Sequence, residues 1–238
     1  MARIKNRPPR EPDPPTDPKI AFARQSLGLE VLDFGRERLQ QKNAMIDLQS
    51  SLGKRYAYGL ATLDKFEIYH KAQESAIAKV REFLADLPSA FREGRSLVLY
   101  GAVGTGKDHI LAASLYQAAM LTIPTNWLSG QEFYGRIRDS MDTGEREESL
   151  MERWGQPFVL GVSDPIPPIG KPSEWNTSQL YRILDRRYRA MRCSWVSMNA
   201  NSLEDADAKL SAPIFDRLRD GACLVPCFWP SYRERKKK

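Results

Sequence analysis

From residue 96 onward, short apolar runs alternate with longer amphipathic or polar stretches. The apolar runs predict strands at residues 96–100, 123–128, 158–162, 194–198 and 222–227. The intervening stretches predict helices at residues 107–121, 131–141, 142–154, 177–191, 204–210 and 214–219. Strands that alternate with helices are typical of a parallel sheet with helices on both faces. We therefore expect an α/β fold for this part of the chain.

The pattern before residue 96 is helical but less regular. Between residues 22 and 52 the apolar positions follow spacings of three and four, and Gly28 and Gly35 interrupt them. This stretch predicts two helices or one broken helix. Its apolar face either packs on the main domain, which we favour, or docks a partner protein. A second apolar face over residues 76–87 predicts a helix that ends at Pro88.

Proline content divides the chain further. Six prolines lie among residues 1–18 and are mixed with charged residues, which predicts an extended or disordered head. Residues 19–58 are expected to form a helical N-terminal extension that binds a partner, and residues 59–238 are expected to form the main domain.

Composition and charge narrow the class of protein. The chain has 238 residues, of which 42% are hydrophobic and 28% charged, as in soluble globular proteins. Its net charge of +6 favours polyanionic partners weakly and fits plain solubility equally well. No apolar run approaches the ~20 residues that span a bilayer, and the basic start has no apolar region of a secretory signal after it. The three cysteines lack zinc-site spacing, so we expect reduced thiols and a cytoplasmic protein.

The sequence GAVGTGKDH connects the first of these strands to the helix expected at residues 107–121. Its glycines allow backbone N–H groups to turn toward phosphates, and the N-terminus of the following helix attracts the same negative charge. The alternative, a glycine-rich turn without a ligand, is disfavoured by the strand–loop–helix context. The residues expected to bind the phosphates are Gly101, Val103, Gly104, Thr105, Gly106, Lys107, Asp108 and His109.

Asp108 departs from the Walker A pattern, in which Ser or Thr follows the lysine and helps to hold Mg²⁺. A carboxylate beside a triphosphate is repelled unless a divalent cation lies between them. Asp108 can therefore bind Mg²⁺ directly, or it can cap the helix by accepting hydrogen bonds from first-turn N–H groups. The sequence leaves both alternatives open.

This loop, with a residue other than Ser or Thr after Lys107 and then His109, resembles the ATP-binding core of DnaC-type helicase loaders and IstB-type transposition helpers. These proteins are AAA+ ATPases related to the initiator DnaA. Further matches are ATLDKFE, SEWNTSQLYRILDRRYRAMR, PIFDRLRDGA and the terminal PSYR, so the resemblance extends from about Leu60 to the C-terminus. It implies a P-loop NTPase (AAA+) domain with ATP and Mg²⁺ as cofactors, behind a small helical extension.

The resemblance also implies a second strand that ends in two acids, one for the Mg²⁺ shell and one to polarise the attacking water. Here Ser163, Asp164 and Pro165 follow the strand expected at residues 158–162. In the register we favour, Ser163 takes the metal position and Asp164 the water-polarising one. In the other register Asp164 comes first and Pro165 replaces the second acid. Either way one carboxylate is missing. Losing a general base or a metal ligand lowers rates about 10²–10⁴-fold, so we expect ATP binding with slow hydrolysis.

Three further residues match family positions. Asn199 resembles the sensor residue that positions the attacking water, although an Asx turn would use the same residue. Arg217 resembles the arginine finger that reaches a neighbouring subunit, which implies an ATP-dependent homo-oligomer; the alternative is an ion pair with Asp216 or Asp220. Arg233 resembles the terminal sensor arginine that acts within its own subunit, or else belongs to a solvated basic tail.

Nucleic acid is the second ligand that the sequence favours, because five arginines crowd one expected helix and RERKKK lies at the end of the chain. We expect salt-sensitive binding of single-stranded or distorted DNA. We interpret the chain as a protein that loads or activates a replicative helicase. The alternatives are a transposition helper, whose partner is a transposase, and a nucleotide-binding adaptor that does not hydrolyse ATP. The five arginines are Arg182, Arg186, Arg187, Arg189 and Arg192.

Overall fold

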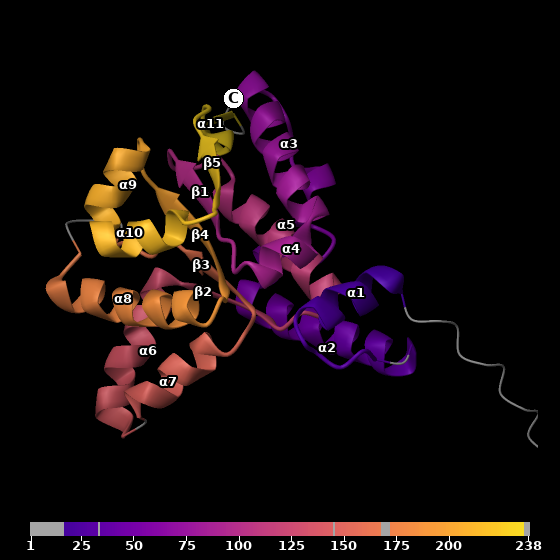
Figure 1. Cartoon of the computed structure of the whole chain (residues 1–238). Coiled ribbons are helices and arrows are strands. Elements are labelled where there is room, and N and C mark those ends of the chain that lie inside the picture. Colours follow the sequence, from indigo (N-terminus) through magenta and orange to yellow (C-terminus); the bar gives the residue numbers. More distant parts are fainter. Residues whose placement is uncertain (1–16, 33, 145, 168–171, 236–238) are drawn as a thin grey trace, which may run out of the picture.

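A five-stranded parallel sheet lies at the centre of the protein (Figure 1). The computed structural model describes residues 17–32, 34–144, 146–167 and 172–235. In sheet order the strands are β2 (Thr125–Ser129), β3 (Val159–Ser163), β4 (Cys193–Asn199), β1 (Leu97–Gly101) and β5 (Cys223–Cys227). The predicted α/β fold is therefore confirmed.

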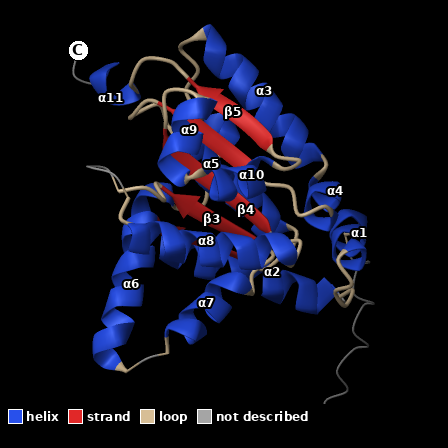
Figure 2. Ribbon diagram, turned by 60° about the vertical axis from the view of Figure 1, so that its left-hand side comes forward, coloured by secondary structure: helices blue, strands red, loops and turns tan. Residues whose placement is uncertain are grey.

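Helices cover both faces of the sheet (Figure 2). One layer consists of α1 (Pro18–Ser26), α2 (Phe34–Leu52), α3 (Lys71–Ala85), α4 (Leu87–Arg92) and α5 (Lys107–Met120). The other consists of α6 (Gly130–Thr143), α7 (Glu147–Gly155), α8 (Glu174–Arg189), α9 (Leu203–Leu210) and α10 (Ala212–Arg219). The 3₁₀ helices η1 (Lys54–Tyr56) and η2 (Leu63–Lys65) connect α2 to α3, and α11 (Tyr232–Arg235) follows β5. None of the helices in the described ranges is long and apolar enough to cross a bilayer.

All five predicted strands are present, and their ends differ from the predicted ones by no more than two residues. The predicted helix end at Pro88 is wrong. Helix α3 already ends at Ala85, and Pro88 lies in the first turn of α4. Proline is accepted there because first-turn N–H groups have no partner within the helix.

Gly161 in β3 lets α5 approach the sheet closely. A Cβ atom at this position would lie 2.6 Å from Cδ1 of Leu115, which is fully buried on α5. Any larger side chain would therefore require Leu115 and Trp127 to shift or α5 to move away from β3. Because α5 begins at the glycine-rich loop, this contact helps to fix the loop relative to the strand ends.

The N-terminal extension packs on the main domain. The guanidinium of Arg24 on α1 donates to the carbonyl and hydroxyl oxygens of Thr122, both at 3.0 Å. Leu48 and Leu52 of α2 join the core, as the favoured interpretation of this stretch expected. The disordered head predicted for residues 1–18 falls mostly on residues 1–16, outside the described residues; Pro18, however, opens α1.

Arg187 is completely buried and joins α8 to the strands beneath it. Its guanidinium donates to backbone carbonyls that precede β3 and to the first residues of β4, and burial lowers its pKa to about 9. It therefore cannot contact DNA as the sequence suggested. Its acceptors are the carbonyl oxygens of Trp154, Gly155, Pro157, Phe158 and Cys193 and the hydroxyl of Ser194.

Other arginines of α8 are also engaged within the chain. Arg182 is paired with Glu147 and Glu148 of α7, and Arg186 with Glu148. Arg189 is paired with Asp185 one turn earlier. The charge that the sequence assigned to DNA on this helix is therefore partly neutralised by neighbouring carboxylates.

The buried guanidinium gives a first test. Replacing Arg187→Lys keeps the charge but offers a compact ammonium instead of a five-donor fork, so buried carbonyls lose their donors. We expect the free energy of unfolding to fall by about 2–3 kcal/mol, measured by urea denaturation. The matched control is Arg189→Lys on the same helix, where the side chain is 71% exposed and the expected change is below about 0.5 kcal/mol. Equal stability of the two variants would contradict this role.

Candidate functional site

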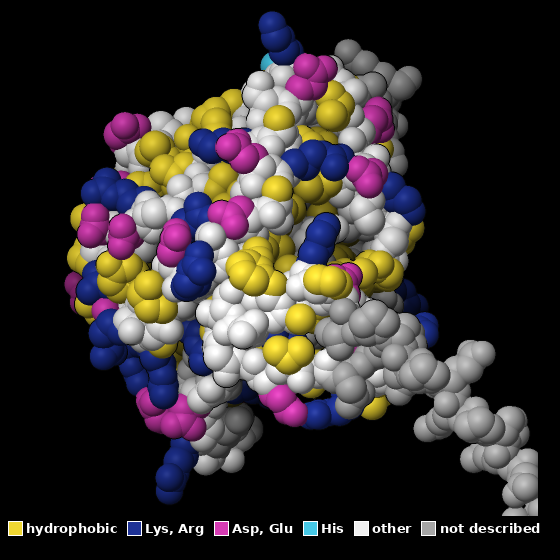
Figure 3. Space-filling model, turned by 45° about the vertical axis from the view of Figure 1, so that its right-hand side comes forward, with side chains coloured by type: hydrophobic (Ala, Val, Ile, Leu, Met, Phe, Trp, Pro, Cys, Tyr) yellow, Lys and Arg dark blue, Asp and Glu magenta, His cyan; other side chains and the backbone are white. Residues whose placement is uncertain are grey.

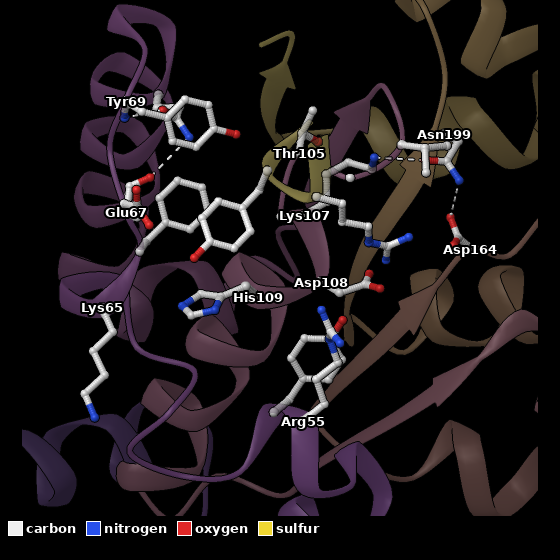
Figure 4. Close-up of a pocket in the computed structure, with 18 residues that line it drawn as sticks. Arg55, Lys65, Glu67, Tyr69, Thr105, Lys107, Asp108, His109, Asp164 and Asn199 are labelled. Atoms are coloured by element: carbon white, nitrogen blue, oxygen red, sulfur yellow. Dashed lines mark hydrogen bonds between the residues drawn. The ribbon is translucent and has the colours of Figure 1, made fainter. Parts of the chain in front are cut away.

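The glycine-rich loop between β1 and α5 borders a cavity of about 560 Å³ (Figure 4). It lies at the carboxyl ends of the parallel strands, where Gly101 ends β1 beside Asn199 of β4. Ligand sites in open α/β sheets occupy this edge. The lining comes from four parts of the chain: the loop itself, the ends of β3 and β4, residues 55–73, and residues 232–233.

The loop is shaped so that its backbone donors are open to the cavity. Among the described residues, the N–H groups of residues 103–108 donate to no carbonyl or side chain. Gly104 has a left-handed backbone with φ of 81°, and a Cβ there would lie 2.1 Å from Oγ of Ser231. Unpaired amides at a helix N-terminus form an anion site. The predicted loop residues therefore fit a phosphate group.

Residues that follow β5 support the loop through two hydrogen bonds. The indole of Trp229 donates to the carbonyl of Thr105 at 2.9 Å, and the backbone N–H of Tyr232 donates to the carbonyl of Gly104 at 3.0 Å. These contacts bring Arg233 of α11 to the cavity wall. Val103 is 61% exposed at the loop tip.

Lys107 is linked through one amide to the carboxylate that follows β3. Its ammonium donates to the carbonyls of Gly101 and Ala102 at 3.1 and 2.7 Å and to Oδ1 of Asn199 at 2.9 Å. The amide of Asn199 in turn donates to Asp164 at 3.0 Å. Figure 4 shows these three side chains in one row. Lys107 is expected in the site from the loop motif, and Asn199 and Asp164 from the family resemblance; the structure brings the three together.

Asp164 is held in a conformation that is uncommon for a residue with a side chain. Its φ is 45°, and its N–H donates to the carbonyl of Ser197 at 2.8 Å. Such left-handed residues cost about 1 kcal/mol or more and gather at functional sites. Burial raises the pKa of Asp164, and the carboxylate of Asp108 raises it further, whereas Lys107 and Arg233 lower it.

Asp108 turns toward the strand ends, and the capping alternative is wrong. Among the described residues, no first-turn N–H group of α5 donates to the Asp108 carboxylate, and the N-cap residue is Gly106, which has no side chain. The Asp108 carboxylate instead accepts hydrogen bonds from the hydroxyls of Ser163 and Ser197, at 2.8 and 2.6 Å. Ser163 therefore faces the start of α5 while Asp164 faces Asn199, which fits the favoured register of the two residues.

The result is an exchange of two functional groups between helix and strand. In P-loop NTPases a hydroxyl follows the Walker A lysine, and the carboxylate that shares the metal ends another strand of the sheet, the Walker B strand. Here the carboxylate belongs to Asp108 on α5 and the hydroxyl to Ser163 on β3, with their oxygens 2.8 Å apart. The same two groups are present, but here the helix carries the carboxylate and the strand carries the hydroxyl.

This oxygen set fits part of a magnesium shell. Carboxylate and hydroxyl oxygens are hard ligands of the kind that Mg²⁺ takes. In the described ranges no three His, Cys, Asp or Glu side chains group closely enough to hold a metal alone. A cation beside Asp108, Ser163 or Asp164 would therefore need phosphate and water oxygens to complete its shell, as Mg²⁺ does in nucleotide sites.

His109 lines the cavity but also makes a contact of its own, whereas Arg217 lies outside the cavity. Nε2 of His109 lies 2.8 Å from the carbonyl of Thr62, and the ring is edge-on to Phe66, so His109 holds the segment before α3 against α5. Arg217 is not part of the cavity lining. Its guanidinium donates to Asp185 at 2.9 Å and to the hydroxyl of Tyr181 at 3.0 Å, both on α8.

Several residues that line the cavity or hydrogen-bond to its side chains were not predicted from the sequence. Ser197 precedes Asn199 by two positions and so projects from the same face of β4, a signal that strand alternation offered. Arg55 and Tyr56 of η1 also line the cavity. No motif marks them, because only the fold places residues 50 positions before the loop beside it.

The fold is similar to those of solved replication proteins. The DnaC helicase loader has a TM-score of 0.64 at 20% identity, covering 73% of this chain and 99% of that protein. DnaI has a TM-score of 0.59 at 17% identity, covering 79% and 98%. The replication initiator DnaA bound to AMPPCP and single-stranded DNA has a TM-score of 0.59 at 20% identity, covering 74% of this chain and 50% of that one.

These neighbours confirm the α/β P-loop fold of AAA+ helicase loaders and initiators, which the resemblance implied. No protein-family model matches the chain, and no curated protein matches its sequence. At these identities the likeness establishes the fold, and roles for individual residues rest on the geometry above.

The exchanged pair gives a second test. Ser163→Asp places a second carboxylate against Asp108, and we expect the free energy of unfolding to fall by about 2 kcal/mol because two like charges share one site. Millimolar MgCl₂ should restore more stability to this variant than to the unmodified chain, since a cation bridges the two carboxylates. Thermal denaturation with and without MgCl₂ measures both effects. The control is Ser163→Asn, of the same shape without charge; an equal loss in this variant would show that charge is not the cause.

Proposed function

We propose that the chain is an ATP-binding AAA+ protein that assembles on DNA and loads or activates a replicative helicase. The observation that carries the proposal is the row of Lys107, Asn199 and Asp164 beside a loop with unpaired amides. The fold shared with the DnaC helicase loader and with DnaI supports the replication role. The DnaA neighbour bound to AMPPCP supports a nucleotide in this loop.

Each residue has a task in this proposal. The loop amides and Lys107 bind the phosphates, and Asp108 with Ser163 holds Mg²⁺, which neutralises charge on the phosphate oxygens. Asp164 polarises the attacking water, and the amide of Asn199 keeps its carboxylate oriented. Arg233 reaches the phosphates from α11 within the same subunit.

Slow hydrolysis is part of the proposal. Only Asp164 remains as an acid at the end of β3, and its pKa is raised by burial and by Asp108, so less of it is ionised at a given acidic pH than of an ordinary aspartate. The same observation favours a second candidate function, a nucleotide-binding adaptor for which ATP is a structural ligand. The two functions differ in turnover and not in binding.

DNA and a protein partner complete the proposed function. On the face in Figure 3, basic side chains are interspersed with acidic and apolar ones, so a contact with DNA there would use single arginines or lysines and not one basic patch. Leu39 and Ile46 lie two turns apart on α2 and are 61% and 54% exposed. We propose that they belong to the face that meets the helicase in the cytoplasm. No observation favours a transposase instead.

Assembly into a homo-oligomer is proposed from Arg217. This arginine is not among the residues that line the cavity of its own subunit, which suits a residue that acts on a neighbouring subunit. Its ion pair with Asp185 and its position over the ring of Tyr181, 4.8 Å from the centroid, hold the guanidinium between α8 and α10, with 26% of the side chain exposed.

The exchanged pair separates the two candidate functions. We expect the unmodified chain to bind ATP with Mg²⁺ and to turn over well below about one per second, a slow rate for an enzyme. The double variant Asp108→Thr with Ser163→Asp restores the usual arrangement and should raise turnover about tenfold or more. Lys107→Ala should abolish binding and is the control. Binding without turnover in either protein would support the adaptor, and absence of binding in the unmodified chain would refute the proposal.

Mixing variants tests the arginine finger. Arg217→Ala and Lys107→Ala should each be inactive alone, the first without a finger and the second without bound ATP. A mixture should recover part of the ATPase activity. In it, Arg217 of a Lys107→Ala subunit can act on the ATP bound by a neighbouring Arg217→Ala subunit. Arg219→Ala, on the same helix and 56% exposed, is the control and should be active alone. A mixture no more active than its components would contradict a role in trans.

A further inference from the structure

The N-terminal extension supplies an arginine to the cavity. Helix η1 follows α2 after the single residue Gly53, and both Arg55 and Tyr56 of η1 line the same cavity as the phosphate loop. Figure 4 shows the Arg55 side chain extending from η1 toward Asp108. A positively charged group from outside the AAA+ core thus points at the place where phosphates and metal are proposed to lie.

The position of η1 is fixed through α5. The hydroxyl of Tyr116 on α5 donates to the carbonyl of Tyr56 at 2.9 Å. The ring of Tyr58 packs edge-on against Tyr116, with centroids 5.3 Å apart. Because α5 begins at the phosphate loop, its contact with η1 sets the distance from Arg55 to the loop.

Arg55 is available to bind an anion. Its side chain is exposed, and among the residues that the structure describes no carboxylate forms an ion pair with it. Burial raises the pKa of Tyr56, the carboxylate of Asp108 raises it further, and Arg55 and Arg233 lower it. These four side chains therefore share one electrostatic environment, although they come from three distant parts of the sequence.

We propose that Arg55 binds the terminal phosphate of the ATP held in its own subunit and so couples the N-terminal extension to the state of the nucleotide. This inference rests on the proposed ATP binding. A guanidinium and a phosphate form strong charge-assisted hydrogen bonds, and the terminal phosphate is the one that ATP has and ADP lacks. Loss of that phosphate releases Arg55.

The joint between η1 and α2 is a glycine that can take up a small movement of η1. Gly53 has a left-handed backbone with φ of 71°, and no atom lies within 4 Å of the position of its Cβ. The backbone can therefore bend there without a steric clash. We therefore expect release of Arg55 to change residues 50–58, around this joint, first.

The first measurement is nucleotide affinity by isothermal titration calorimetry on the full chain. Arg55→Gln should weaken ATP binding by about tenfold to hundredfold, the effect of losing a charge-assisted hydrogen bond. ADP binding should change by less than about twofold, since ADP lacks the γ-phosphate that Arg55 is proposed to bind. The control is Lys54→Gln, a neighbouring exposed cation that does not line the cavity; its affinities should equal those of the unmodified chain.

The outcomes separate this inference from the proposed function. If the unmodified chain binds neither nucleotide, the proposed function fails and the inference fails with it. If the unmodified chain binds ATP but Arg55→Gln binds ATP equally well, or loses ATP and ADP affinity to the same extent, only the inference is overturned.

Hydrogen exchange tests the coupling itself. With a non-hydrolysable ATP analogue, amides of residues 50–58 should exchange more slowly than with ADP in the unmodified chain and in Lys54→Gln. In Arg55→Gln at saturating nucleotide, this difference should disappear while protection of the phosphate loop remains. Equal protection with both nucleotides in the unmodified chain would overturn the coupling.

Discussion

The carboxylate of Asp108 joins the first turn of α5 to the ends of two strands, and the geometry of the whole site depends on this junction. Hydroxyls of Ser163 on β3 and Ser197 on β4 both donate to it. The positive N-terminal end of α5 favours a negative charge there. Because α5 also packs closely on Gly161 of β3, electrostatics at one end of the helix and packing along its side fix the same relative position.

Around this junction the cavity is assembled from both ends of the chain. Residues after β5 support the phosphate loop through Trp229 and Tyr232, and the hydroxyl of Tyr69 before α3 donates to the carbonyl of Pro230. The extension before residue 59 adds η1 to the same rim. A ligand in the cavity would therefore touch, directly or through one residue, segments from both ends of the described chain.

The sequence predicted the strands, the loop and Lys107, because these depend on local periodicity and on a short motif, and the family resemblance added Asn199 and Asp164 to the same row. It did not determine which way the Asp108 side chain turns. A carboxylate in the first turn of a helix can either cap that helix or face the strands. It assigned Arg187 to a surface, because helical spacing alone does not show that its guanidinium fits among carbonyls 30 positions away. Arg55 carries no motif, and only the packing of η1 on Tyr116 places it at the cavity.

The exchange between Asp108 and Ser163 makes these two positions epistatic. A chain with the usual hydroxyl on the helix and carboxylate on the strand differs from this one by two substitutions, and each order of change passes through a different intermediate. One intermediate has two hydroxyls, which can hydrogen-bond to each other without a charge. The other has two carboxylates, which repel unless a cation separates them. The path through two hydroxyls therefore lowers the stability of the fold less. The path through two carboxylates is tolerated only by a protein that already holds its metal.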